Sequence, residues 1–275
     1  MSRSIQERRA DFRRLHERGC FVIPNPWDVG SARMLASLGF KALATTSSGF
    51  AWSQGHADST MSREVVLAHL RVISQATDLP VNADFEAGYA VTPEGVAESV
   101  RMAIETGVAG LSIEDATYDE ANPLRPIDEA VARMRAARAA IDESRSGVLL
   151  VGRAENFIVG RPDLDDAIVR LKAYSAAGAD CLYAPGIRTR EQVSAVVKAV
   201  APKPVNLLIG FPSDLTVKDV EALGVRRISV GGALARAAWG GFVRAAKLIA
   251  DEGKFDEFAK AMSGNELNKL MSWAP

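Results

Sequence analysis

The sequence contains few cysteines and few histidines, and this scarcity excludes two kinds of site. Its 275 residues include only Cys20 and Cys181, each just ahead of an apolar run. Two cysteines cannot build a disulfide framework, so we expect reduced, packed thiols. The three histidines, His16, His56 and His69, are too scattered along the chain for a metal site with histidine ligands. Any metal site is therefore expected to use oxygen ligands.

The sequence also lacks a large net charge and a long hydrophobic run. Its net charge is −1, with 24% charged residues, which gives it no bulk attraction for nucleic acid or membranes. The N-terminal stretch "MSRSIQERRADFRRLHERGC" is charged, and no later stretch approaches the ~18 uninterrupted apolar residues of a membrane span. We expect a cytoplasmic protein that binds a small molecule, and neither nucleic acid nor a membrane.

What the sequence does contain is a regular alternation of two patterns. Segments such as 93–107, 129–144 and 164–179 carry apolar residues at the three- and four-residue spacing of helices. Between such segments, apolar runs of strand length recur at residues 20–25, 42–47, 80–85, 109–115, 148–156, 181–186, 204–210 and 227–232. Continuous apolar strands that alternate with helices are typical of a parallel sheet covered by helices.

Eight strand and helix units in a chain of this length predict an α/β fold of the closed (β/α)8 type, a TIM barrel. An open doubly wound sheet is the alternative, although such sheets usually stop at about six strands. No linker-like stretch divides the chain, so residues 1–275 are predicted to form one barrel domain. Residues 254–275 are predicted to add one or two short helices as a C-terminal extension whose apolar side chains need a partner surface.

Acidic residues gather where the predicted strands end. Asp84 and Glu86 follow the third strand in "PVNADFEAGYA", and Glu114 ends the fourth. Because barrel active sites lie at the C-terminal ends of the strands, we expect these residues to converge there. Converging carboxylates repel one another unless a cation lies among them, and all-oxygen ligands favour Mg²⁺ or Mn²⁺. The alternative is a structural ion pair between Arg153 and either Glu86 or Glu114.

Two strand ends rich in glycine are candidates for binding an oxyanion. Ser48 and Gly49 follow the second strand, where glycine lets the backbone approach a ligand and present N–H groups. A solvated turn accounts for the same composition. Gly231 and Gly232 follow the eighth strand and are similar to the phosphate-binding loop of barrels, with tight packing as the alternative role.

Together these motifs resemble those of the isocitrate lyase and phosphoenolpyruvate mutase superfamily. "ADFEAGY" is similar to the A-D-x-D-x-G-[YFH] signature, with Asp84 and Glu86 in the two acidic places. "SIEDA" is similar to the segment whose glutamate, here Glu114, binds the ion. The similarity continues through "PNPWDVGSARMLASLGFKAL", "SSGF" with Asp58 after it, "LLVGRAENF", "PVNLL" and "LGVRRISVGGALARAA". It spans roughly residues 18–250 in one order.

The resemblance implies a barrel in which Mg²⁺ or Mn²⁺, held by Asp84, Glu86 and Glu114, binds a small 2-oxo acid or its enolate. It implies that Ser48 donates to the same oxygen and that Asp58 holds the outer sphere of the ion or a catalytic water. It also implies that Arg153 grips a carboxylate or phosphonate in fork geometry. The candidate catalytic residues are therefore Asp58, Arg153 and Ser48. The candidate substrate-binding residues are Ser48, Gly49, Phe50, Arg153 and Asn206.

Departures from the motifs of the family restrict the expected reaction. Isocitrate and methylisocitrate lyases carry a K-[KR]-C-G-[HS] loop after the fourth strand, whereas this chain reads "EDATYDEANPLRPIDEA" and has no cysteine there. Glu86 also stands in place of an aspartate, and Ala154 in place of the usual threonine. We therefore expect a lyase that cleaves a C–C bond next to a 2-oxo group, like an oxaloacetate decarboxylase or a 2-alkylmalate or methylisocitrate lyase.

Two other functions stay open, together with the assembly of the protein. The first is a phosphonopyruvate or phosphoenolpyruvate mutase or hydrolase that acts on a P–C bond. The second, of another class, is a non-catalytic barrel that has kept the ion site for binding or assembly. Because the last barrel helix is swapped between subunits in the resembled family, the resemblance also implies a homo-oligomer, a dimer or tetramer.

Overall fold

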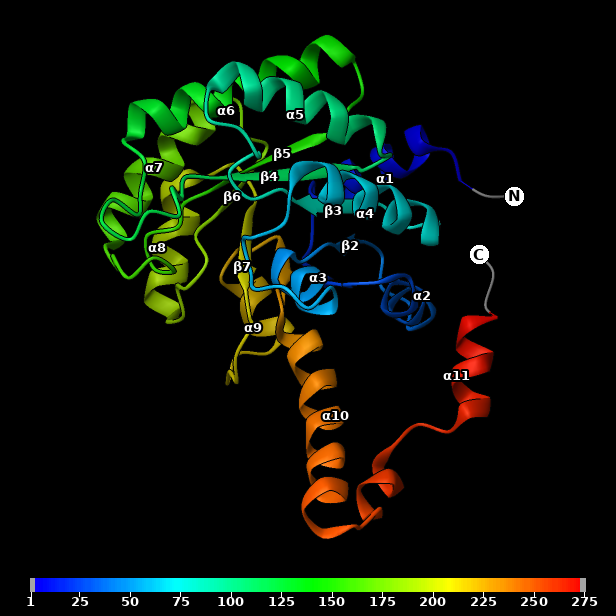
Figure 1. The fold of residues 1–275 in the computed structure, drawn as a ribbon. Helices are drawn as coiled ribbons and strands as arrows, with labels where there is room; N and C mark the ends of the chain where they lie inside the picture. Colours follow the sequence, from blue (N-terminus) through cyan, green and yellow to red (C-terminus); the bar gives the residue numbers. More distant parts are fainter. Residues whose placement is uncertain (1–2, 273–275) are drawn as a thin grey trace.

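The sheet of this protein is a ring of eight parallel strands. We describe residues 3–272 of a computed structural model, shown in Figure 1. Each strand lies within one of the eight apolar runs, which confirms the predicted pattern. The strands are β1 (Phe21–Ile23), β2 (Leu43–Ala44), β3 (Val81–Asp84), β4 (Gly110–Glu114), β5 (Leu149–Arg153), β6 (Cys181–Tyr183), β7 (Val205–Leu208) and β8 (Arg227–Ser229).

The order of the strands confirms a (β/α)8 barrel and rules out the open doubly wound sheet. Neighbours in the ring follow the order β1-β8-β7-β6-β5-β4-β3-β2, and every pair is parallel. The first strand pairs with the last, with Phe21 opposite Arg227. Between β1 and β2 the ring is nearly closed by a hydrogen bond of 3.0 Å from the Ala44 N–H to the Pro24 carbonyl.

Helices cover the outside of the ring, and most begin at a side-chain cap. Thr92 caps α5 by accepting a hydrogen bond from the Gly95 N–H, with Pro93 at the first helical position, as the sequence predicts. The helices after β3, β4 and β5 confirm the three predicted segments. Those that precede β8 are α1 (Ile5–Leu15), α2 (Val29–Ser37), α3 (Ser47–Ser53), α4 (Arg63–Ala76), α5 (Pro93–Glu105), α6 (Ile127–Ser144), α7 (Leu164–Ala176), α8 (Arg190–Val200) and α9 (Val217–Ala222).

The first helix is bound to the barrel through two buried arginines. Arg9 of α1 donates to the Val108 carbonyl at 2.9 Å and to the Ile104 carbonyl at 2.7 Å. Arg8 donates to the carbonyls of Ser74 and Thr77. These carbonyls lie at the C-terminal ends of α4 and α5, where the helix dipole favours a cation.

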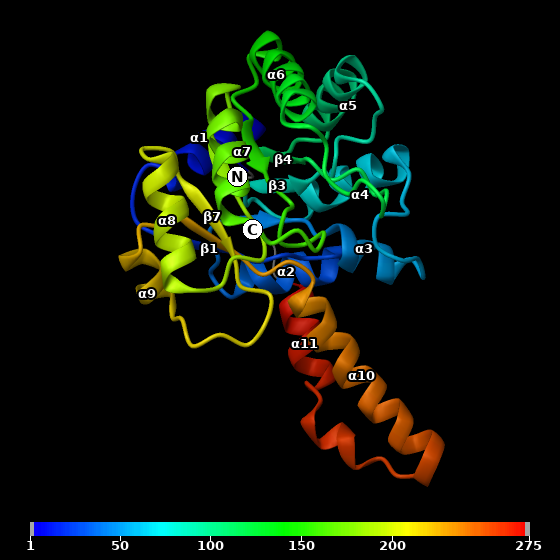
Figure 2. The same cartoon turned by 90° about the vertical axis from the view of Figure 1, so that its left-hand side faces the viewer.

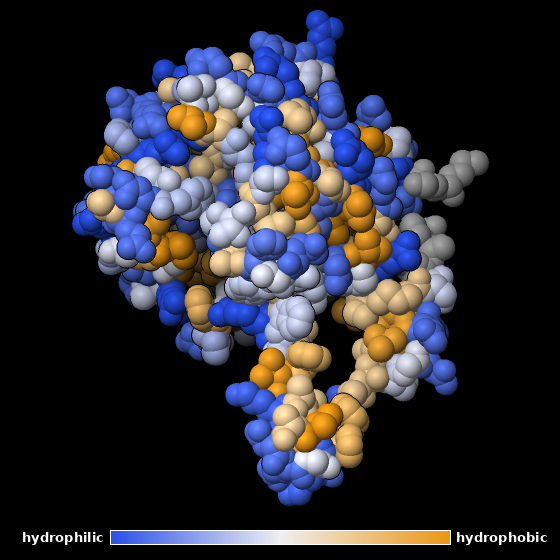
Figure 3. Space-filling model, in the orientation of Figure 1, coloured by the Kyte–Doolittle hydropathy of each residue, from blue (hydrophilic) through white to orange (hydrophobic). Residues whose placement is uncertain are grey.

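The C-terminal part of the chain extends away from the barrel. After β8, α10 (Ala233–Glu252) projects outward, and η1 (Asp256–Lys260) and α11 (Gly264–Met271) turn back so that α11 contacts α2 (Figures 1 and 2). Apolar side chains remain exposed along this arm, among them Trp239 at 40% and Phe242 at 62% (Figure 3). Of the predicted extension over 254–275, residues 273–275 lie outside the described part of the chain. Among the helices within residues 3–272, none combines the length and apolar composition that crossing a membrane requires.

Candidate active site

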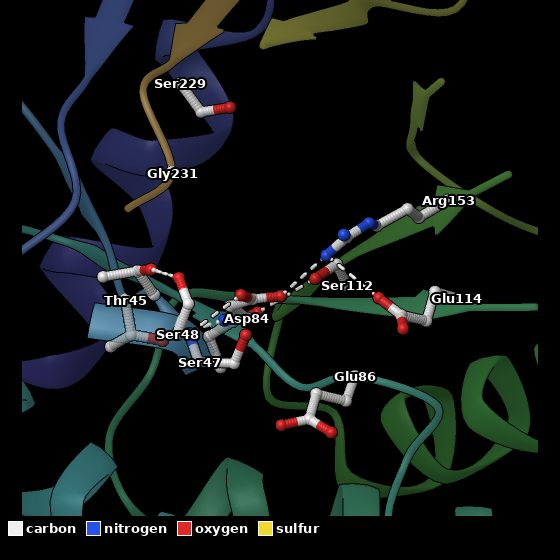
Figure 4. A network of polar contacts seen from close by, with 12 residues as sticks. Thr45, Ser47, Ser48, Asp84, Glu86, Ser112, Glu114, Arg153, Ser229 and Gly231 are labelled. Atoms are coloured by element: carbon white, nitrogen blue, oxygen red, sulfur yellow. Dashed lines mark hydrogen bonds and ion pairs between the residues drawn. The ribbon is translucent and has the colours of Figure 1, made fainter. Parts of the chain in front are cut away.

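A cavity of about 370 Å³ opens among the C-terminal ends of the strands. Four of the predicted site residues line it, namely Ser48, Asp58, Asp84 and Arg153. They come from the first turn of α3, the loop after α3, the end of β3 and the end of β5. Figure 4 shows Asp84 between Ser47 on one side and Arg153 on the other. The structure therefore brings together the catalytic candidates that were far apart in the sequence.

Asp84 is held by contacts from both sides. One carboxylate oxygen accepts a hydrogen bond of 3.0 Å from the Ser47 N–H, and the other accepts one of 3.0 Å from Arg153 Nη1. The Asp84 N–H donates to Thr45 Oγ1 at 2.9 Å, which fixes the backbone as well. Because Ser47 begins α3, its N–H is one of the free donors of a helix start and suits an anionic acceptor.

Arg153 lies among three carboxylates and is fully engaged by them. Its Nη1 approaches Glu114 at 2.9 Å and Asp84 at 3.0 Å, and its Nε and Nη2 both bind the carboxylate of Glu155. Its guanidinium also lies 5.3 Å from the centre of the Tyr183 ring. The fork that was predicted for a substrate therefore binds Glu155 here, and the alternative ion pair forms with Glu114. No contact within the described residues joins Arg153 to Glu86.

Glu86 and Glu114 are buried, and each accepts a hydrogen bond from a tyrosine. The hydroxyl of Tyr89 donates to Glu86 at 2.8 Å, and that of Tyr118 donates to Glu114 at 2.8 Å. Burial, together with the charges of Asp84, Glu114 and Asp58, raises the pKa of Glu86 to about 7, although the hydrogen bond from Tyr89 opposes this. Burial likewise raises the pKa of Glu114, although the charge of Arg153 opposes this.

The backbone around these two acids adopts a conformation that side chains disfavour. Glu86, Tyr89 and Tyr118 have φ values of 44°, 51° and 63°. Non-glycine residues in this region cost of the order of 1–3 kcal/mol each and cluster at functional sites. Three such residues around one group of acids therefore indicate a functional role for the site.

The carboxylate oxygens of this site suit a divalent cation that only some of them would contact directly. Five acids surround this end of the barrel with Arg153 as the cation among them: Asp58, Asp84, Glu86, Glu114 and Glu155. Burial and the charge of Asp84 also raise the pKa of Asp58. Within residues 3–272, no three acidic, histidine or cysteine side chains are grouped closely enough to bind one ion together. The residues therefore fit an ion that Asp84 contacts and that the other acids reach through water, as Mg²⁺ often prefers.

The predicted oxyanion site around Ser48, Gly49 and Gly232 is tightly packed. Ser48 Oγ lies 3.1 Å from Thr46 Oγ1 and faces the cavity. A Cβ on Gly49 would lie 2.7 Å from a methyl of Thr46, and one on Gly232 would lie 2.8 Å from Ser48 Oγ. Both glycines are therefore required by packing, and Gly232 leaves the room that the Ser48 hydroxyl occupies.

Phe50 and Asn206, like Gly49, were predicted to bind the substrate but do not line the cavity. Phe50 is buried, and its ring stacks on His69 with 3.7 Å between the centroids. Asn206 is fully buried and donates to Ser229 Oγ at 2.9 Å, while its own oxygen accepts from Arg227 Nε at 2.8 Å. The roles of both residues toward a substrate stay predictions.

Sequence reasoning missed the tyrosines and one arginine of this site. Tyr89 lies three residues after Glu86, and Tyr118 lies four after Glu114, so proximity in the sequence was an available signal. Tyr183 ends β6 on the side where the cavity opens. Arg227 begins the buried strand β8. A charged residue inside an apolar run was the sequence feature that could have indicated its role.

We expect Glu86→Gln to stabilise the metal-free protein at pH 8 but not at pH 4. The raised pKa of Glu86 means that folding favours the neutral acid. The cost of ionising it is absent below the ordinary pKa of about 4.5, and it is fully present above pH 7. The glutamine also keeps an acceptor for Tyr89. Removing the charge should add on the order of 3 kcal/mol at most, or roughly 5–10 °C in Tm. Thermal unfolding at the two pH values measures this, and an equal effect at both would contradict it.

Comparisons with known proteins agree with this geometry. A family model of phosphoenolpyruvate phosphomutase matches residues 12–250. A Burkholderia cenocepacia J2315 protein with a provisional assignment as a lyase or mutase is 46% identical over 99% of both chains, with a TM-score of 0.95. The structure of 2,3-dimethylmalate lyase, a member of the PEP mutase/isocitrate lyase superfamily, is 26% identical over 99% of this chain and 95% of that one, with a TM-score of 0.85.

A curated relative of known activity is also similar over most of its length. The oxaloacetate decarboxylase of Bradyrhizobium diazoefficiens is 33% identical over 225 residues, which cover 78% of this chain and 74% of that protein. Lyases and mutases are thus among the proteins to which this sequence is similar. The chain belongs to the phosphoenolpyruvate phosphomutase family, within the enzyme superfamily that its motifs resemble.

Proposed function

We propose that this protein is a Mg²⁺-dependent lyase that cleaves a C–C bond next to the 2-oxo group of a small acid, with oxaloacetate decarboxylation as the leading candidate. The observation that carries the proposal is the position of Asp84, at the wall of a cavity and at the centre of an excess of acids. The activities named for 2,3-dimethylmalate lyase and oxaloacetate decarboxylase support the same class of reaction.

The residues of the cavity would each contribute to such a cleavage. Breaking the C–C bond leaves an electron pair as an enolate, and a bound divalent ion would stabilise that charge by several kcal/mol. Asp84 would hold the ion, with Glu86, Glu114 and Asp58 acting through water. The Ser48 hydroxyl would donate a hydrogen bond to the developing oxyanion. Arg153 would keep Asp84 and Glu114 oriented and charged.

Cleavage or rearrangement of a P–C bond is the second candidate function. The description of the matching family model, phosphoenolpyruvate phosphomutase, favours it. The same acids and the same hydroxyl would serve a phosphonate, because both reactions pass through an enolate of a 2-oxo acid.

A turnover assay with two detection channels tests these proposals. The purified protein is incubated with oxaloacetate, 2-alkylmalates and phosphonopyruvate, once with Mg²⁺ and once with EDTA. Pyruvate released from oxaloacetate is the expected product, and EDTA should abolish it. Because Mg²⁺ alone decarboxylates oxaloacetate slowly, the Asp84→Asn variant at the same Mg²⁺ concentration is the matched control. Phosphorus NMR would instead reveal P–C chemistry, and a protein that binds Mg²⁺ without any turnover would overturn both candidates.

We also propose that the protein is a homo-oligomer formed through α10 and the segment after it. Trp239 and Phe242 of α10, and Phe255 and Phe258 after it, are between 40% and 62% exposed. Leaving this much aromatic surface in water is unfavourable, and a second copy could cover it. Light scattering of the purified protein should give a dimer or tetramer, and a monomer would contradict the proposal.

A further inference from the structure

Arg227 is a buried cation at the deep end of the active-site cavity. It begins β8, is 2% exposed and contributes to the cavity wall. Its Nε donates to the Asn206 oxygen at 2.8 Å, and its Nη1 donates to the Asn82 oxygen at 3.2 Å and lies 3.4 Å from His16 Nε2. Within residues 3–272, no ion pair involves this guanidinium.

The other buried arginines bind either carboxylates or main-chain carbonyls. Arg170 binds Asp115 and Asp166, and Arg153 binds three acids. Arg8, Arg9 and Arg133 donate to main-chain carbonyls. Arg227 instead contacts neutral side chains. Because a buried charge without a counter-charge costs several kcal/mol, this arrangement favours an anion that enters the cavity.

The groups that face Arg227 are neutral near pH 7. Burial lowers the pKa of His16 to about 3, so the imidazole is uncharged. Burial raises the pKa of the Cys181 thiol and raises that of Tyr183 to about 12, so neither supplies a negative charge. The side chains packed around the guanidinium therefore leave its charge uncompensated.

The acids of the cavity and the cation without an acidic partner come from different levels of the strands. The lining contains two acids, Asp58 and Asp84, together with Arg153, which pairs with Asp84, and Arg236, which donates to the Gly210 carbonyl. Arg227 begins β8 and Asn82 is the second residue of β3, so both lie deeper in the barrel than Tyr183 and Ser229, which end their strands. Ser229 Oγ accepts a hydrogen bond from Asn206 and is also hydrogen-bonded to the side chain of Tyr183, and Figure 4 shows Ser229 well apart from Asp84.

The separation of the two levels matches the length of a short dicarboxylate. Asn82 precedes Asp84 by two residues on β3, and it contacts Arg227. Two residues of a strand cover roughly 6–7 Å. A four-carbon diacid could therefore present its 2-oxo acid end to Asp84 and Ser48 and its other carboxylate to Arg227.

We propose that Arg227 is an anion-binding residue that takes the distal carboxylate of the substrate, and hence that the substrate is a dicarboxylic 2-oxo acid. The assignment of a substrate carboxylate rests on the proposed function. Arg153 does not compete for this role, because its donors bind Asp84, Glu114 and Glu155.

Ligand binding tests the proposal without requiring turnover. The probes are malate and 2-hydroxybutyrate, which differ in that a methyl group replaces the terminal carboxylate of malate. Calorimetry in the presence of Mg²⁺ should show malate binding the unmodified protein at least 10-fold more tightly. In Arg227→Gln this ratio should fall to within about 2-fold. Arg188→Gln removes an exposed guanidinium that lies 4.5 Å from the ring centre of Phe211, a residue of the cavity lining, and should keep the ratio.

Each outcome of this experiment tests the binding role of Arg227 independently of whether the protein turns over oxaloacetate. An equal affinity of the unmodified protein for the two probes, or an unchanged ratio in Arg227→Gln, would overturn the proposal even if oxaloacetate is turned over. If Arg227→Gln does not fold, Arg227→Lys retains the charge without the fork and should show a reduced but measurable preference for malate.

Discussion

Replacing Asp84 by asparagine is expected to lower kcat by on the order of 10³-fold while the barrel stays folded. Removing the carboxylate that would contact the ion should cost most of the several kcal/mol that a Lewis acid supplies, and each 1.36 kcal/mol is a factor of ten. Asparagine keeps an oxygen that can accept from the Ser47 N–H or from Arg153. The loss should therefore come from the ion and the reaction, with little change in stability.

The measurement combines turnover with Mg²⁺ titration. Calorimetry should show Mg²⁺ affinity falling together with kcat, and thermal unfolding should change little. Asp214→Asn is a matched control, because Asp214 is exposed in the loop between β7 and α9 and should retain full activity. Undiminished turnover in Asp84→Asn would remove the ion from the mechanism.

Arg153→Met is expected to destabilise the protein by about 3–5 kcal/mol, the usual cost of removing one partner from a buried charge network. Methionine fills a similar volume but leaves Asp84, Glu114 and Glu155 without their shared cation. The pKa of Glu155 is already raised to about 8 by burial, against the opposing charge of Arg153. Without that charge, the pKa values of Glu114 and Glu155 should rise further.

The loss should therefore be larger at pH 8 than at pH 5. Acids with raised pKa values destabilise the fold only where they must ionise, so the variant should recover part of its stability at low pH. Urea unfolding at both pH values measures this. Adding Glu155→Gln to Arg153→Met removes one uncompensated charge and should restore part of the loss. A destabilisation below 1 kcal/mol, together with a KM raised 10- to 100-fold, would instead make Arg153 a substrate ligand.

The barrel could be predicted from the sequence because its strands and helices carry local patterns. Buried strands such as "VLLVG" in β5 are continuous apolar runs, and Thr92 with Pro93 marks the start of α5. The number of units then selects a closed ring. The outward course of α10 could not be predicted in the same way, because its direction depends on tertiary contacts.

The sequence predicted which acids form the site, but it did not predict which side chains form ion pairs with one another. Asp84, Glu114 and Arg153 each end a strand, so their convergence follows from topology. Which of them bind one another depends on side-chain rotamers, and the sequence left open whether Arg153 serves a substrate or an ion pair. Arg227 was missed for a related reason: the partners that leave its charge uncompensated, Asn82 and Asn206, come from other strands.

The closure of the barrel also affects how the chain folds during synthesis. β1 pairs with β8, which is the last strand of the barrel to be synthesised. The helix before β1, α1, is held by carbonyls at the C-terminal ends of α4 and α5. Until residue 227 has emerged, one edge of β1 has no strand beside it and can pair with another chain. β1 is therefore the first strand to be synthesised and among the last to be paired on both edges. We expect the protein to be most prone to aggregation late in translation.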